Sequence, residues 1–310
     1  MTSGFYNGAV VRRSLMHFMV GKGLAGAIGL SMLVLLVRML PREEYAIYIV
    51  LTALFEMLQM GSNLGAISAA YRYIPELRSR GNAWGLLQLS RQLLTFRFAT
   101  LALSAGLLLL LGSHVAGWVG MPALLPVLHV YIYVLVFEGI ARFTDILFDS
   151  LLLQGFSQIS VLIRNGLRIT GLLAFKLGLI GFVSFNILAW SSIEAIASGI
   201  GAICSVTLYM SNVKVGPDVA RPAGAVLDYP RILRCSIPLY FSPIVTLAQG
   251  ADVMKVLVAR VSDAIQTGSF GFATALNTMI QRYLPAFLLI GMVRPLFVSR
   301  LNPLGRMSAI

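Results

Sequence analysis

The stretch LMHFMVGKGLAGAIGLSMLVLLVRML, residues 15–40, decides the fold class. Between His17 and Arg38 it holds one charged side chain, Lys22. A helix that crosses a bilayer needs about 20 mainly apolar residues, so this stretch predicts a membrane-spanning helix. It is longer than the apolar region of a cleaved signal peptide and lacks a clear small-residue cleavage site, so we expect it to be retained.

The overall composition agrees with a membrane protein. Of the 310 residues, 58% are hydrophobic and 12% are charged. A soluble domain carries about 25% charged residues because its surface faces water. Most of the outer surface of this chain is therefore expected to face lipid. The two cysteines, Cys204 and Cys235, are too few for a disulfide scaffold or a cysteine-based metal site.

Seven further apolar stretches follow the first, which predicts an all-α polytopic membrane protein with about eight transmembrane helices. The expected spans are residues 15–40, 45–70, 93–111, 124–147, 159–180, 185–209, 237–258 and 270–297. Between the sixth and seventh spans, residues 211–234 contain three prolines and lack helical periodicity. We expect that segment to be a cytoplasmic linker without a helix.

The positive charge of the chain is explained by its expected topology. Lys and Arg number 24 against 12 Asp and Glu, a formal net charge of +12. One side carries most of the cations: Arg12, Arg13, Arg72, Arg78, Arg80, Arg91, Lys214, Arg221, Arg231, Arg234, Arg294, Arg300 and Arg306. Residues 112–121 and 181–184, on the other side, have none. By the positive-inside rule both termini are cytoplasmic, and a nucleic-acid partner is not needed.

A shift of 222 residues aligns the chain with itself. The polar matches are Arg12 with Arg234, Ser14 with Ser236, Arg38 with Arg260, Thr52 with Thr274 and Gln59 with Gln281. The shift preserves orientation, so the repeat would be parallel, with an axis along the membrane normal. It predicts a six-helix first lobe (1–210), a linker (211–235) and the first two helices of a second lobe (236–310). The alternative is a chance match between two apolar membrane helices.

Several motifs resemble one transporter family. Residues 37–48, VRMLPREEYAIY, look like the first-hairpin signature of polysaccharide-type flippases, with Ala46 in place of the usual glycine. These flippases belong to the multidrug/oligosaccharidyl-lipid/polysaccharide exporter superfamily. Residues 249–252, QGAD, followed by Lys255 and Arg260, are similar to the pattern in the seventh span of that family, where Arg is commoner than Lys at position 255. The NLG at 63–65 and YIPE at 73–76 also fit.

The resemblance implies a fold and a function. Members have two helical lobes around a central cavity, and they move undecaprenyl-pyrophosphate-linked sugars across the bacterial inner membrane by alternating access. It implies no enzyme activity, no cofactor beyond a coupling ion (Na⁺ or H⁺), and polysaccharide polymerase or assembly proteins as partners. Because the chain supplies only two helices of the second lobe, we expect a truncated product or one that assembles with another chain.

Charged residues inside the expected spans are the candidate site. Glu138, Arg142, Asp145 and Asp149 share one helical face by their spacing of three and four, and so do Arg164 and Arg168. One interpretation is a set of ion pairs in a helical hairpin, Asp149 with Arg164 and Asp145 with Arg168. The other is that Arg142, Arg164 and Arg168 face a cavity and bind a pyrophosphate through their guanidinium groups.

Further ionisable residues extend this candidate site. Lys22 would lie about 15 Å along the first helix from Arg12, and either faces the cavity or extends to the interface. Lys255 either binds the headgroup or pairs with Asp252, three residues earlier on the same helical face. Asp252 and Glu56 are candidates for ion coupling, with Glu194 a weaker one. Arg97 is expected to reach a membrane interface.

Other function classes remain as alternatives or are disfavoured. An ion-coupled multidrug antiporter of the same fold would expose acidic residues in its cavity. A non-transporting remnant or a scaffold for polysaccharide assembly would explain the short second lobe. A membrane glycosyltransferase would need a large extramembrane loop. The three histidines lack metal-ligand spacing, and no phosphate-binding glycine loop or Ser-His-Asp order is visible.

Overall fold

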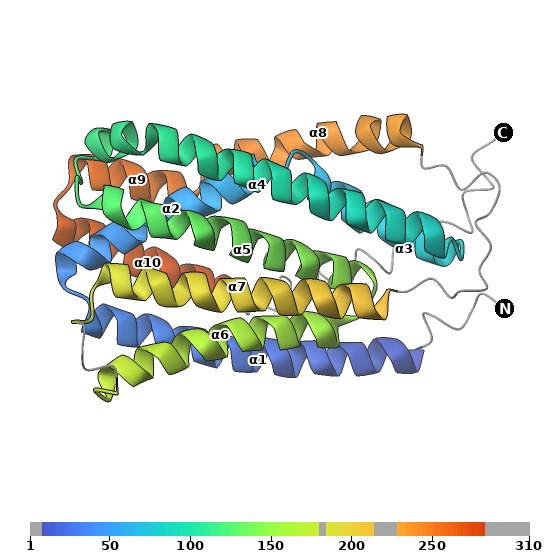
Figure 1. The fold of residues 1–310 in the computed structure, drawn as a ribbon, viewed down its shortest axis with the longest axis horizontal. Coiled ribbons are helices and arrows are strands. Elements are labelled where there is room, and N and C mark those ends of the chain that lie inside the picture. The colour runs from blue at the N-terminus through green and yellow to red at the C-terminus, as the bar shows by residue number, and fades with distance from the viewer. Residues whose placement is uncertain (1–7, 180–183, 214–227, 283–310) are drawn as a thin grey trace.

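A computed structural model describes residues 8–179, 184–213 and 228–282, in which helices joined by short turns are present and no strand occurs. The helices run side by side along the long axis of an elongated bundle (Figure 1). They are α1 (Gly8–Met39), α2 (Arg42–Gly61), α3 (Ala66–Ser79), α4 (Ala83–Val119), α5 (Leu124–Ser150), α6 (Gln154–Lys176), α7 (Ile187–Asn212), α8 (Tyr229–Ala248), α9 (Ala251–Val261) and α10 (Ala264–Arg282).

The structure confirms a helical protein with membrane-spanning character. Four helices are long and apolar enough to cross a membrane: α4, α5, α7 and the Met19–Met39 part of α1. The pair α2 and α3, bent by 54°, would make a fifth. The eight spans expected from the sequence are therefore not confirmed. The polar residues of α6 include Arg164 and Arg168, which are buried against other helices rather than exposed to lipid.

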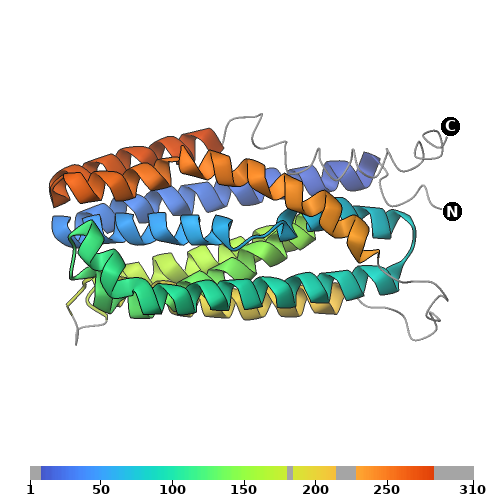
Figure 2. The same ribbon diagram turned by 90° about the horizontal axis from the view of Figure 1, so that it is seen from above.

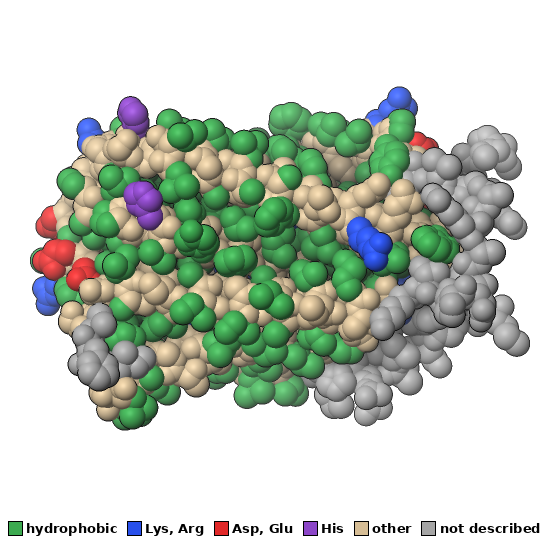
Figure 3. Space-filling view, viewed as in Figure 1, with side chains coloured by type: hydrophobic (Ala, Val, Ile, Leu, Met, Phe, Trp, Pro, Cys, Tyr) green, Lys and Arg blue, Asp and Glu red, His purple; other side chains and the backbone are tan. Residues whose placement is uncertain are grey.

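The outer surface agrees with a lipid environment. Leu103, Leu107 and Leu110 form an exposed stripe along α4, and Leu110 is 77% exposed. In water such a stripe would be costly, whereas hydrocarbon solvates it. Figure 3 shows hydrophobic side chains over most of the middle of one face, with the charged ones lying toward its two ends.

Two expected elements differ from the observed ones. The seventh expected span, 237–258, is not one helix, because α8 ends at Ala248 and α9 starts at Ala251 after Gly250. The expected linker also ends earlier than predicted, because α8 already begins at Tyr229. Asp228 accepts a hydrogen bond from the Arg231 N–H at 3.0 Å, and Pro230 lies in the first turn, where a helix tolerates it. Residues 283–297 of the eighth expected span lie outside the described residues.

The helix boundaries follow the expected repeat. Adding 222 to the end of α1 (Met39) and to the start of α2 (Arg42) gives 261 and 264, which are the end of α9 (Val261) and the start of α10 (Ala264). In Figure 1, α1 and α8–α9 run in one direction along the bundle, and α2 and α10 return in the other. Helices α9 and α10 both pack against α2 and lie on the opposite side of it from α4 and α5 (Figure 2).

Arg97 corrects another sequence expectation, because it is buried rather than at an interface. It is 3% exposed, and it donates hydrogen bonds to the Gln59 carbonyl at 2.8 Å, to Gln59 Oε1 at 2.5 Å and to Ser62 Oγ at 3.0 Å. The C-terminus of a helix carries partial negative charge, which favours a cation there. Arg97 therefore stabilises the end of α2 next to the bend into α3.

Candidate functional site

A buried ionic network lies between α2, α5, α6 and α7. Glu138 on α5 is at its centre and is 4% exposed. Its Oε2 accepts a hydrogen bond from Arg168 Nη2 at 2.7 Å, and its Oε1 accepts one from Arg142 Nε at 3.1 Å. The Nε of Arg164 lies 3.6 Å from Oε2. One carboxylate is therefore shared by three guanidinium groups, so its buried charge is paired.

The ion pairs between α5 and α6 exist, but with partners other than the expected ones. Arg164 Nη2 donates to Asp145 Oδ2 at 2.6 Å, and Arg168 pairs with Glu138. The expected pairs Asp149–Arg164 and Asp145–Arg168 are wrong, by about one helical turn for Arg164 and about two turns for Arg168. The turn was expected near 155–157, whereas α6 already starts at Gln154, so each arginine faces an earlier residue of α5.

Arg142 extends the network to α2. Its Nη1 lies 2.8 Å from Glu56 Oε1, and its guanidinium carbon lies 4.8 Å from the centre of the Phe55 ring. The side chains of Arg142 and Glu56 are 40% and 35% exposed, whereas that of Arg164 is 3% exposed. Arg142 and Glu56 are therefore the two members of the network that a solute could reach most easily.

Glu194 on α7 is the most weakly paired acid of the network. Its Oε1 lies 3.9 Å from Arg168 Nε and accepts a long hydrogen bond of 3.4 Å from the Tyr48 hydroxyl. Its Oε2 has no hydrogen-bond partner among the described residues. The network holds four acids, Glu56, Glu138, Asp145 and Glu194, against three arginines. The described groups therefore carry one formal negative charge in excess.

Serine side chains complete the network from α7. Ser198 accepts a hydrogen bond from Arg168 at 2.8 Å and donates one to Glu138 at 3.1 Å, and Ser205 lies 2.5 Å from Ser160. Ser191, Ser198 and Ser205 are all fully buried. Sequence reasoning missed them, although their spacing of seven marks a single face of one helix.

The two candidate lysines lie elsewhere in the structure. Lys22 is partly buried on α1, which packs against α6, and it interacts electrostatically with Asp149 on α5. Lys255 Nζ lies 2.8 Å from Asp252 Oδ1, which confirms the expected ion pair within α9. The structure therefore brings together Arg142, Arg164, Arg168 and Glu56, but Asp252 and Lys255 form a separate pair.

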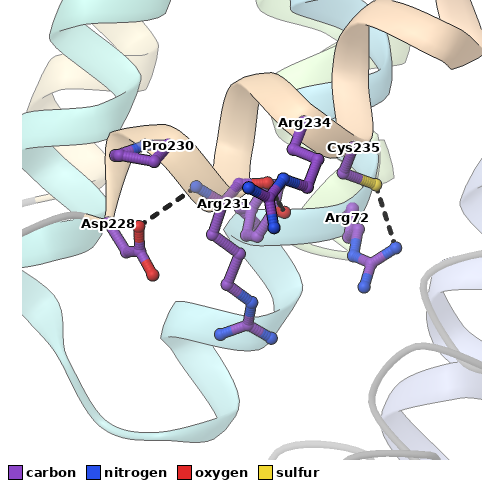
Figure 4. Close-up of a pocket in the computed structure, with 7 residues that line it drawn as sticks. Arg72, Asp228, Pro230, Arg231, Arg234 and Cys235 are labelled. Carbon is purple, nitrogen blue, oxygen red and sulfur yellow. Dashed lines mark hydrogen bonds between the residues drawn. The ribbon is translucent and has the colours of Figure 1, made fainter.

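A second polar site, a pocket of about 440 Å³, lies between α3 and α8 (Figure 4). Its lining residues are Arg72, Tyr73, Asp228, Pro230, Arg231, Arg234 and Cys235. The sequence interpretation counted its three arginines as determinants of topology, and Arg234 also as a match in the repeat. Nothing in their spacing shows that α8 returns beside α3, so the pocket could not be expected from sequence.

Neither site is a metal centre among the described residues, where no group of His, Cys, Asp or Glu side chains could hold a metal ion. Comparison with protein-family models, curated proteins and solved structures gives no match. Functional assignment therefore rests on the residues and their geometry.

Proposed function

We propose that the chain belongs to a system that exports lipid-linked oligosaccharides across the bacterial inner membrane by alternating access. The observation that carries the proposal is that the turn between α1 and α2 and the turn between α9 and α10 lie 222 residues apart, as the repeat predicts. Within that repeat Ile49 and Gly271 occupy equivalent positions, and a Cβ placed on Gly271 would overlap the Ile49 side chain. A contact between equivalent residues is what a two-fold axis between α2 and α10 requires. Two lobes related by such an axis are typical of transporters with a central substrate site.

The proposed roles of the site residues follow from their exposure. Arg142 is the best placed to bind the pyrophosphate of the substrate, because it is partly exposed and carries a guanidinium fork. Arg164 and Arg168 hold Glu138 and Asp145, and they contribute to headgroup binding only if those ion pairs open. Lys22 and Lys255 supply further positive charge, and Glu56 and Asp252 are the proposed ion-coupling acids.

We further propose that the end of the bundle with the pocket between α3 and α8 is cytoplasmic. Arg72, Arg80, Arg231 and Arg234 are all exposed at that end. The opposite end also carries the exposed acids Glu43 and Asp263 beside its cations. The positive-inside rule favours the first end for the cytoplasm, where α1 begins.

A reconstituted transport assay tests the proposal. The purified chain is placed in vesicles with a fluorescent undecaprenyl-pyrophosphate oligosaccharide, and transfer between leaflets is measured with an impermeant glycosidase. We expect transfer by the wild type and a rate about tenfold lower for Arg142→Ala, because a charged hydrogen bond to the substrate is lost. Lys176→Ala is the matched control, since Lys176 is an exposed cation at the end of α6 and should leave the rate unchanged.

A second candidate is a non-transporting scaffold for polysaccharide assembly. The observation that favours it is that Arg164 and Arg168 are held in ion pairs and are only 3% and 8% exposed. A wild-type chain that transfers neither the lipid-linked sugar nor cationic dyes would favour the scaffold. Dye efflux without sugar transfer would instead favour the ion-coupled multidrug antiporter.

A further inference from the structure

Three arginines from two helices line the pocket between α3 and α8. Arg72 extends from α3, and Arg231 and Arg234 extend from α8 (Figure 4). The volume of about 440 Å³ is within the range of small-ligand sites. The pocket contains none of the residues proposed for substrate binding or ion coupling, so its ligand is independent of the proposed function.

Two of these arginines have no carboxylate partner among the described residues. Arg72 Nη1 donates to the Cys235 thiol sulfur at 2.9 Å, and its guanidinium lies 5.6 Å from the centre of the Tyr73 ring. Arg234 has neither an ion pair nor a hydrogen bond from its side chain within the described ranges. Both side chains are exposed. Their charge is therefore available to an anionic ligand.

Two acids near the pocket are already engaged. Asp228 caps the first turn of α8 through the Arg231 N–H. Glu76 is shared by Arg80 at 2.6 Å and Arg231 at 3.3 Å. The four arginines Arg72, Arg80, Arg231 and Arg234 thus face two carboxylates, an excess of two positive charges among the described residues. An anion would neutralise this excess.

The walls of the pocket are held in place by contacts between α8 and the α2–α3 segment. The Tyr73 hydroxyl donates to the Arg231 carbonyl at 3.0 Å, and the Tyr240 hydroxyl donates to the Gly61 carbonyl at 2.5 Å. Gly65 packs against the backbone of Ser236 so closely that a Cβ would lie 2.7 Å from its carbonyl oxygen. The arginines therefore project from a preformed base, which lowers the entropic cost of binding.

Two aromatic side chains near the pocket indicate its depth in a membrane. The pocket is at the end of the bundle where α4 and α8 begin (Figure 1). Trp84 and Tyr229, at the first turns of these two helices, are exposed. Exposed Trp and Tyr at helix ends are typical of the membrane–water interface, and α4 is one of the helices long and apolar enough to span a membrane.

We propose that this pocket binds the phosphate group of an anionic membrane-lipid headgroup. Guanidinium forks match phosphate oxygens in pairs, and basic pockets between spanning helices bind phosphorylated lipid headgroups. The acyl chains would lie along the exposed apolar side chains of α8, among them Leu233, Ile237 and Phe241. A soluble phosphate would gain the ionic contacts but not this apolar contact.

Lipid retention measured by native mass spectrometry tests the proposal. The full chain is extracted from bilayers of equimolar phosphatidylcholine and phosphatidylglycerol, and bound lipid is counted. We expect preferential retention of phosphatidylglycerol by the wild type. Arg72→Gln and Arg234→Gln should each lower it about fivefold, since each cation near the surface contributes about that factor. Arg231 is left intact because it pairs with Glu76.

The controls separate this site from general electrostatic attraction. Lys176→Gln and Arg260→Gln remove exposed cations at the opposite end of the bundle and should leave retention unchanged. Equal retention of both lipids by the wild type, or full retention by the Arg72→Gln/Arg234→Gln variant, would overturn the proposal. Displacement of the lipid by inorganic phosphate or pyrophosphate would assign the pocket to a soluble anion instead. If the glutamine variants lose helix content, Arg72→Lys/Arg234→Lys replaces them, because it keeps both charges and removes the paired guanidinium contacts. A smaller loss of retention is then expected, and unchanged retention would overturn binding through the guanidinium forks.

Discussion

At the scale of single residues, Glu138 determines how the centre of the bundle is organised. Its two oxygens are shared by Arg142, Arg164, Arg168 and Ser198. Glu194 lies close by, but its nearest cationic atom is 3.9 Å away. The network has one acid more than it has arginines. Neutralising Glu138 and neutralising Glu194 should therefore change the stability of the protein by different amounts.

We predict that Glu138→Gln destabilises the protein by about 3 kcal/mol or more, because it leaves buried guanidinium groups without their counter-charge. Glu194→Gln should change the stability by about 1 kcal/mol or less, because it removes the excess negative charge and only weak contacts. The measurement is the free energy of unfolding in detergent micelles, followed by far-UV circular dichroism. Equal losses for the two isosteric variants would contradict the proposed charge balance.

At the scale of helices, glycines set how closely the elements pack. Gly65 joins α2 to α3 with a φ of +84° and contacts the α8 backbone at Ser236. Gly81 joins α3 to α4 with a φ of +69°, and no described atom lies within 4 Å of its Cβ position. The two glycines share a conformational requirement, but only Gly65 also has a packing requirement.

We predict that Gly65→Ala separates α8 from α3, whereas Gly81→Ala does not. Both substitutions carry the cost of a left-handed backbone, about 1–2 kcal/mol, and Gly65→Ala adds the clash with Ser236. In a Cys204→Ser background, the rate of maleimide labelling of Cys235 reports the separation. Faster labelling is expected for Gly65→Ala alone, and equal rates for the two variants would show that the contact does not hold α8.

A second pair of glycines tests the packing of α6 on α7. A Cβ on Gly201 of α7 would overlap the side chain of Arg164, whereas no described atom lies within 4 Å of the Cβ position of Gly166 on α6. We predict that Gly201→Ala lowers the free energy of unfolding by about 1–3 kcal/mol through overpacking. Gly166→Ala should be neutral or raise it by up to about 1 kcal/mol through helix propensity.

The same micelle unfolding assay distinguishes the two variants. Arg164 binds Asp145. The decrease in the free energy of unfolding caused by Asp145→Asn should therefore be smaller in a chain that already carries Gly201→Ala. Additive effects would mean that Gly201 acts independently of the ionic network.

At the scale of the whole molecule, the first hairpin and the α8–α10 segment meet at α2 and α10. The proposed two-fold axis passes between Ile49 and Gly271. We predict that Ile49→Cys and Gly271→Cys, in a chain lacking Cys204 and Cys235, form a disulfide on oxidation because the side chains would be in direct contact. A shift in gel mobility reports it.

The control pair is Ile49→Cys with Gly166→Cys. Gly166 lies on α6, and α2 and α6 are not neighbouring helices in the bundle. The control should stay unlinked under the same conditions. Linking of both pairs, or of neither, would contradict the proposed arrangement of the two hairpins.

The sequence predicted the larger features of this arrangement and missed the smaller ones. Residues 15–40 and 124–147 were correctly expected as helices because long apolar runs allow few alternatives. The break at Gly250 was missed because apolar stretches flank it on both sides and together reach the length of one span, although Gln249 and Asp252 separate them. The predicted partners of Arg164 and Arg168 were wrong by one and two helical turns, because a small error in the position of the turn between two helices shifts every contact along the hairpin.

The sequence by itself determined that the protein is helical and suited to a membrane, and it singled out Glu138, Arg164 and Arg168 but not the buried Arg97. Apolar length and residue spacing are local properties, so the chain displays them directly. Only the tertiary structure decided that Glu138 is shared by three arginines, that Arg97 caps α2 and that α8 completes a basic pocket with α3. Those features depend on distances between residues remote in sequence, which helix packing sets and no local pattern contains.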